Sequence, residues 1–129
     1  MPGLILDSGA VSYFADASAD YARAVMAVFG SEDLWPPRVP SVVLVECLTG
    51  HPQKDARTHM FLKGCDVTTI LSESAARRAA RLRTLAGRGS AVEAALVALA
   101  EPRGLIITSD KQDLTALAAN AMGVTIEVV

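Results

Sequence analysis

The chain has 129 residues, with 12 lysines and arginines against 14 aspartates and glutamates, and its pI is near 5.6. The hydrophobic fraction of 51% excludes a disordered chain, and the length suits a single domain over residues 1–129. Uncharged stretches are shorter than the roughly 20 residues of a membrane span, and the acidic pI argues against binding nucleic acid by bulk positive charge. The start has no basic n-region and the two cysteines are too few for a disulfide framework, so we expect a cytoplasmic protein with reduced thiols.

The first half of the chain predicts a strand, several short helices and one proline-rich segment. Residues 4–6 form an apolar run that reads as a buried strand and ends in a turn, Asp7-Ser8-Gly9. Helical spacing of apolar residues predicts a helix over 17–29, closed by Gly30. Three prolines limit 35–40 to a short edge strand or an extended link. Two more helices are expected over 42–48, beginning at Pro40-Ser41, and over 54–62.

The second half alternates strands and longer helices. Strands are expected over 66–70, 105–108 and 124–129, and helices over 72–85, 90–103 and 113–121, with Gly104 ending the second of these helices. This alternation is typical of βαβ units with a parallel sheet. We therefore expect one α/β domain with three layers.

Two aspartates follow predicted buried strands directly. Asp7 comes after Leu-Ile-Leu, and Asp110 comes after Leu-Ile-Ile-Thr-Ser. Ligands of open parallel sheets bind beyond the carboxyl ends of the strands, and adjacent strands would bring these two acids together. The structural alternative is that each is a turn or N-cap residue.

Three further acids have their own alternatives. Glu46 is the one charge in an otherwise apolar segment, so it is expected on or beside a buried face, unless the helix turns one exposed stripe outward. Glu93 lies in Ser-Ala-Val-Glu, which matches a capping box at the start of a helix. Asp113 could cap the helix after Asp110. Together, these acids form an oxygen-ligand set that suits Mg²⁺ or Mn²⁺ and two-metal phosphodiester hydrolysis.

The other patterns in the chain are weaker. Cys47, His51, His59 and Cys65 are possible zinc ligands, but without paired spacing they read better as buried cysteines and solvated histidines. Glycine-rich nucleotide-binding motifs are missing. Five arginines fall within one helix and its exit, and of these Arg77, Arg81 and Arg88 could share a face that contacts RNA; a solvated helix face explains them as well. Aromatic residues make up only 5%, which argues against extensive base stacking and for recognition of RNA shape.

Four segments in order resemble the PIN-domain ribonucleases, in particular the VapC toxins of bacterial toxin–antitoxin pairs. They are Leu-Ile-Leu-Asp-Ser-Gly-Ala from residue 4, Val-Leu-Val-Glu ending at Glu46, Val-Glu-Ala-Ala-Leu-Val-Ala-Leu-Ala from residue 92, and Gly-Leu-Ile-Ile-Thr-Ser-Asp-Lys-Gln-Asp-Leu from residue 104. The similarity extends over nearly the whole length.

The resemblance implies a five-stranded parallel sheet between helices, and an Mg²⁺- or Mn²⁺-dependent endoribonuclease that leaves a 5′-phosphate. It assigns catalysis and metal binding to Asp7, Glu46, Glu93 and Asp110, with Asp113 as an accessory metal ligand and with Ser8 and Thr108 orienting carboxylates or water. Members usually have Asp where this chain has Glu93, and the extra methylene could alter metal preference or activity. A homodimer, an RNA substrate and a cognate antitoxin that places an arginine in the acidic site are also implied.

Two alternatives remain open. A phosphoacceptor receiver domain has similar length and alternation, but it needs paired acids after the first strand and a lysine after the last. A PIN domain without catalytic activity would act as a binding module. Glu93, which stands where members usually have Asp, keeps this second alternative open.

Overall fold

The computed structural model describes residues 3–17, 19–31, 33–68 and 71–129, and a parallel sheet of five strands forms its centre. The strands are β1 (Leu4–Leu6), β2 (Arg38–Pro40), β3 (Asp66–Thr68), β4 (Leu105–Thr108) and β5 (Thr125–Val128). Their order across the sheet is β3-β2-β1-β4-β5, and each neighbouring pair runs parallel. The expected parallel five-stranded sheet is confirmed.

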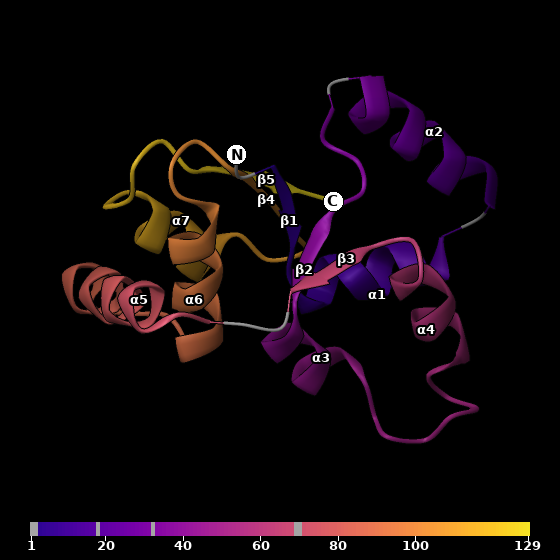
Figure 1. The fold of residues 1–129 in the computed structure, drawn as a ribbon, viewed down its shortest axis with the longest axis horizontal. Helices are drawn as coiled ribbons and strands as arrows, with labels where there is room; N and C mark the ends of the chain where they lie inside the picture. Colours follow the sequence, from indigo (N-terminus) through magenta and orange to yellow (C-terminus); the bar gives the residue numbers. More distant parts are fainter. Residues whose placement is uncertain (1–2, 18, 32, 69–70) are drawn as a thin grey trace.

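Helices cover both faces of this sheet, as expected for three layers. They are α1 (Ser8–Asp16), α2 (Ala19–Ser31), α3 (Ser41–Cys47), α4 (Ala56–Leu62), α5 (Glu73–Ala86), α6 (Ala91–Ala100) and α7 (Gln112–Ala118). Figure 1 shows α5, α6 and α7 grouped on one side of the strands, with α1, α2 and α4 on the other. None of the helices in the described ranges is long and apolar enough to cross a membrane.

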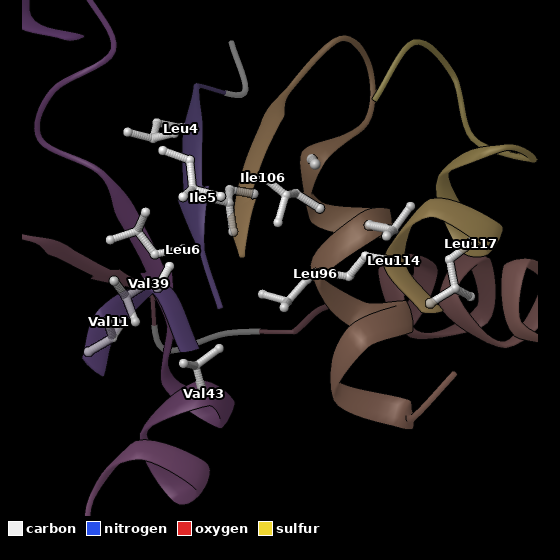
Figure 2. Close-up of a cluster of buried hydrophobic side chains, with 14 of the residues drawn as sticks. Leu4, Ile5, Leu6, Val11, Val39, Val43, Leu96, Ile106, Leu114 and Leu117 are labelled. Carbon is white, nitrogen blue, oxygen red and sulfur yellow. The ribbon is translucent and has the colours of Figure 1, made fainter. Parts of the chain in front are cut away.

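The core forms where β1 lies between the two helical layers. Leu4, Ile5 and Leu6 are at most 1% exposed, because a central parallel strand is covered on both faces. In Figure 2, Leu4 and Leu6 project to the side of Val11 on α1, and Ile5 projects to the side of Leu96 on α6. This alternation is the period of two that a strand imposes on its side chains.

Two expectations for the first 40 residues were wrong. The chain does not make a simple turn after β1: Asp7 is the N-cap of α1, which begins at Ser8 and buries Val11 and Phe14. The proline-rich strand β2 lies inside the sheet, between β1 and β3, and is not an edge strand. Pro40 fits there because it is the last residue of β2, and the pairing of β2 with β1 is limited to Ile5 opposite Arg38.

Helix boundaries also shift. α2 continues through Gly30 to Ser31, so this glycine does not end it. α6 ends at Ala100 and does not reach residue 103, because Glu101 precedes Pro102 and a residue before proline avoids the helical region. α7 covers 112–118, whereas 113–121 was expected. The strand expected over 66–70 is β3 up to Thr68, and residues 69–70 lie outside the described residues.

The strand order bears on the receiver alternative. Receiver-like, flavodoxin-type sheets have the order 2-1-3-4-5, with the third strand next to the first. Here β4 takes the place next to β1, and β3 is an edge strand. The topology therefore contradicts a receiver domain.

Candidate active site

The carboxyl ends of β1 and β4 meet at one edge of the sheet. The two strands are adjacent and in register, with Leu6 opposite Ile107, so the residues that follow them are brought together. Asp7 follows β1 and its amide donates to the carbonyl of Ile107 at 3.3 Å. Asp110 lies two residues after the end of β4. The expected convergence of these two strand ends is present, and Figure 1 shows α1 leading away from the end of β1.

Asp7 lies at the centre of this edge. Its Oδ1 accepts a hydrogen bond from the amide of Ala10 at 2.8 Å, which caps α1, and its Oδ2 accepts one from the hydroxyl of Thr108. Burial raises the pKa of Asp7 above its ordinary value; the two hydrogen bonds oppose this shift, and the negative charges of Glu93 and Glu46 add to it. The two glutamates thus make ionisation of Asp7 less favourable.

Thr108 connects the two aspartates. The residue is fully buried, and its Oγ1 lies within hydrogen-bond distance of Asp7, of the Asp110 carbonyl (2.9 Å) and of the Asp110 amide (3.0 Å). A hydroxyl has one hydrogen to donate, and a carboxylate is a stronger acceptor than a carbonyl, so we assign that hydrogen to Asp7. Thr108 then accepts from the Asp110 amide and holds the loop after β4 in place. Its expected orienting role is consistent with this position.

Asp110 has an exposed side chain whose Oδ1 accepts from the amide of Gln112 at 3.1 Å. It therefore serves as a turn residue before α7, which is the structural alternative that the sequence left open. Ser8, the other residue expected to orient groups, is half-buried as the first residue of α1, directly after Asp7.

Glu93 forms the capping box that its spacing predicts. Its Oε1 accepts from the amide of Ser90 at 3.0 Å, and its own amide donates to the Ser90 hydroxyl at 3.1 Å. The carboxylate is half-buried at the N-terminus of α6. Glu93 thus has a structural role and also contributes charge beside Asp7.

Glu46 departs from its expected placement. It is exposed, as is its neighbour Val45 at 80%, because the short helix α3 buries only Val43 completely. The exposed-stripe alternative is the correct one for this residue. Its negative charge is the smallest of the effects on the pKa of Asp7.

Asp113 and Arg88 bind each other. Arg88 Nε lies 2.6 Å from Asp113 Oδ1, which joins the loop before α6 to the first turn of α7. Asp113 does not cap α7, whose N-cap is Lys111. Asp113, expected as an accessory metal ligand, and Arg88, expected as a possible RNA contact, are thus paired with each other.

The arginines on α5 differ from one another in their contacts. Arg77 is exposed and pairs with Glu73 at 2.8 Å, and Arg81 is exposed, with no hydrogen bond or ion pair to the described part of the chain. Arg78, which the sequence did not single out, makes two hydrogen bonds, of 2.7 and 2.8 Å, to Glu101. The Glu101 side chain is only 4% exposed, and Arg78 together with the amide of Met122 lowers the pKa of this carboxyl. We call this Arg78–Glu101 pair the clamp, because it joins α5 to the residue after α6. The sequence alone does not distinguish such a pair from two charges in solvent.

Gly9 has a steric role at the same edge. A Cβ on this residue would lie 2.0 Å from Ser109 Oγ and 3.0 Å from Ser109 Cβ, so α1 and the loop after β4 approach too closely for a side chain. A glycine at this position could not be explained from the sequence, because the contact joins residues 100 positions apart.

The candidate acids have the right ligand chemistry for a divalent cation, but their side chains are not placed to coordinate one. The candidate acids supply only oxygen donors, which Mg²⁺ and Mn²⁺ prefer. Within the described ranges, however, no three Asp, Glu, His or Cys side chains are close enough to hold one ion. Glu93 is turned toward Ser90 and Asp113 toward Arg88, so these side chains would have to rotate to bind a metal.

Comparison with known proteins places the fold. A chain of the crystal structure of DNA-bound VapBC from Salmonella typhimurium superposes with a TM-score of 0.72 and 15% sequence identity, over 99% of this chain and 98% of the other. This chain has a PIN-like fold. No protein-family model and no curated protein matches the sequence.

Proposed function

We propose that this PIN-like protein is an Mg²⁺- or Mn²⁺-dependent endoribonuclease and the toxin of a toxin–antitoxin pair. The observation that carries the proposal is the environment of Asp7. A half-buried carboxylate at the carboxyl edge of the sheet is held in position by Thr108 and Ala10 and is repelled by Glu93 and Glu46. Crowding of like charges is unfavourable in the protein alone, and a bound cation would relieve it.

Each acid has a part in this proposal. Asp7, Glu46, Glu93 and Asp110 would hold the cation, with Glu93 turned away from Ser90, and Asp113 would add a ligand once released from Arg88. When bound, Mg²⁺ or Mn²⁺ would lower the pKa of a water and stabilise the leaving oxygen of the RNA phosphodiester. The protein's own contribution is to keep Asp7 ionised and oriented, through the hydroxyl of Thr108 and the first turn of α1.

The proposal also includes the partners of the protein. The structurally similar chain comes from a VapBC assembly, and sequence motifs at all four expected positions support a toxin of that type. An antitoxin with an arginine for the acidic edge, a homodimer and a cytoplasmic location are parts of the proposal. The RNA substrate is expected to be recognised without bulk positive charge, since the net charge is −2.

An RNA cleavage assay tests the proposal. Purified protein is expected to cut RNA with Mg²⁺ or Mn²⁺ and to stop when EDTA is added. Asp7→Ala should lose cleavage by roughly a hundredfold or more, since a metal ligand and its orienting contacts are lost. Glu93→Asp should retain or increase cleavage. Pure wild-type protein that cuts no RNA with either metal would rule out the enzyme.

One observation favours a second function, a binding module without catalysis. Glu93 is engaged in the capping box and Asp113 in an ion pair, and no three ligands of the described chain are in place for a metal. In that case wild-type protein would bind its partner but cut no RNA, and Glu93→Asp would leave it inactive.

A further inference from the structure

A solvent-open hollow of about 550 Å³ adjoins the acidic edge. Its walls include Gly9, Ser12 and Tyr13 of α1, Tyr21 of α2 and Ser109 in the loop after β4. Gly9 lies two residues after Asp7, and Ser109 directly precedes Asp110. A molecule with its phosphate at these aspartates would therefore extend into the hollow.

Both tyrosines of the chain line this hollow. Tyr13 and Tyr21 are each 42% exposed, and their rings meet edge to face with centroids 5.9 Å apart. Tyr13 also packs edge to face on the buried Phe14, at 5.6 Å, which fixes its position. The phenol of Tyr21 is neutral at physiological pH, because its ordinary pKa of 10.0 is raised further by a hydrogen bond with Tyr13. The hollow thus offers an uncharged aromatic wall.

The charge of the hollow selects the type of group that can occupy it. Its one charged lining residue in the described chain is Asp16, whose side chain is 72% exposed at the end of α1. Arg57 of α4 comes within 3.9 Å of Asp16 but does not line the hollow. A negative lining residue repels phosphate, so a flat and uncharged group suits the hollow better.

We infer that this hollow stacks a nucleobase of single-stranded RNA on Tyr13, beside the phosphate that reaches Asp7 and Asp110. The inference rests on the proposed ribonuclease function and assigns Tyr13 as a base-binding residue beside its site. Bases of unpaired RNA stack on exposed aromatic rings, whereas bases within an A-form duplex are not available for this contact. The low aromatic content of the chain does not oppose the inference, because both tyrosines are at this one place.

The test measures RNA binding and cleavage separately. A short single-stranded RNA that contains 2-aminopurine is titrated with Asp7→Asn protein, alone or combined with Tyr13→Leu or Tyr13→Phe. Stacking should quench the fluorescence; Tyr13→Leu should weaken binding roughly tenfold and remove the quench, and Tyr13→Phe should stay within about twofold. Leu85→Ala, at an exposed position on α5, is the matched control for loss of surface area and should behave as the parent. A fully paired RNA of the same sequence should show no dependence on Tyr13.

Cleavage by proteins that retain Asp7 separates the two proposals. Tyr13→Leu should raise KM roughly tenfold with kcat nearly unchanged. If wild-type protein cuts RNA and Tyr13→Leu matches it in KM and in binding, the stacking inference is wrong and the ribonuclease proposal stands. If no RNA is cut but binding and quenching depend on Tyr13, the ribonuclease proposal fails and the hollow is still an RNA site. An effect of Tyr13→Leu on protein-partner binding alone would overturn the inference.

Discussion

The hydroxyl of Thr108, at the end of β4, donates a hydrogen bond to the carboxylate of Asp7, just beyond the end of β1. The bond joins residues 101 positions apart in the sequence and depends on the parallel pairing of the two strands. It lowers the pKa of Asp7 against the opposing effect of burial. Thr108 therefore keeps Asp7 ionised, which the proposed site needs.

Thr108→Val should move the pH dependence of cleavage. Without the hydroxyl the pKa of Asp7 rises further, so the acidic limb of the kcat/KM profile should shift to higher pH. Valine has a similar shape, but it leaves the Asp110 amide without its acceptor, at a cost of about 1–3 kcal/mol of stability. Thr108→Ser retains the hydroxyl and is the matched control. Profiles that coincide for the valine and serine variants would contradict this role of Thr108.

Asp7→Asn should stabilise the protein while it removes cleavage. The folded-state pKa of Asp7 is raised, so its ionisation opposes folding at pH values above that pKa. The stability due to this group falls as pH rises from the ordinary value of 3.8 through the raised pKa, and the loss is complete above it. Asparagine can still cap α1, so its melting temperature should exceed the wild-type value at pH 7 and approach it below pH 3.8. A lower melting temperature at pH 7 would contradict this account.

Glu93 offers a pair of substitutions that separates its two roles. Glu93→Gln preserves the capping box but removes the charge, so stability should change by less than about 0.5 kcal/mol while cleavage falls by roughly tenfold or more. Glu93→Asp preserves the charge and shortens the side chain, so cleavage should persist while the cap weakens by about 0.5–1 kcal/mol. Urea denaturation and initial cleavage rates measure the two effects. Equal cleavage by the glutamine variant and wild type would remove Glu93 from the site.

Arg88→Gln tests whether the ion pair with Asp113 restrains the proposed metal site. Both side chains are substantially exposed, so the loss in stability should be below about 1 kcal/mol. The freed Asp113 should lower the Mn²⁺ concentration needed for half-maximal cleavage. Arg88→Lys keeps the charge and serves as the control. If Arg88 binds RNA instead, the glutamine variant will show a higher KM for RNA and an unchanged Mn²⁺ requirement.

Arg78 and Arg77 should differ in stability although they are adjacent. Arg78→Ala leaves the buried Glu101 carboxylate without its cation and should cost about 2–3 kcal/mol, somewhat less than a fully buried pair because Arg78 is one-third exposed. Arg77→Ala breaks an exposed pair and should cost less than about 0.5 kcal/mol. The pKa of Glu101 is lowered, so this contribution is present above the ordinary value of 4.5 and is lost as pH falls below it. Equal urea midpoints for the two variants would show that the clamp is not structural.

The repeating patterns of the sequence were enough to predict most of the architecture. Apolar runs such as Leu105–Thr108 and the Ser90–Glu93 capping box depend on local chemistry, and both lie where expected. α1 was missed because Gly9 and Ser12 interrupt its apolar pattern and its cap, Asp7, reads as a turn. The interior position of β2 follows from long-range pairing, which overrides the usual edge preference of proline.

The candidate site could be predicted in part. Asp7 and Asp110 could be predicted because each follows a strand, and adjacent parallel strands end at the same edge of the sheet. The pairing of Asp113 with Arg88 and of Arg78 with Glu101 joins elements far apart in the chain, so neither was visible in the sequence. Glu46 is exposed because only Val43 of α3 is fully buried. The apolar sequence of this helix does not show how much of it the rest of the protein covers.

The most direct measurement is the rate of RNA cleavage against Mn²⁺ concentration, for wild-type protein and Asp7→Asn in parallel. We predict a saturable, EDTA-sensitive rate for wild type and a rate lower by roughly a hundredfold or more for a variant that is folded and at least as stable. Equal rates for the two proteins, or no cleavage by wild type at any Mn²⁺ or Mg²⁺ concentration, would contradict a metal-dependent ribonuclease centred on Asp7.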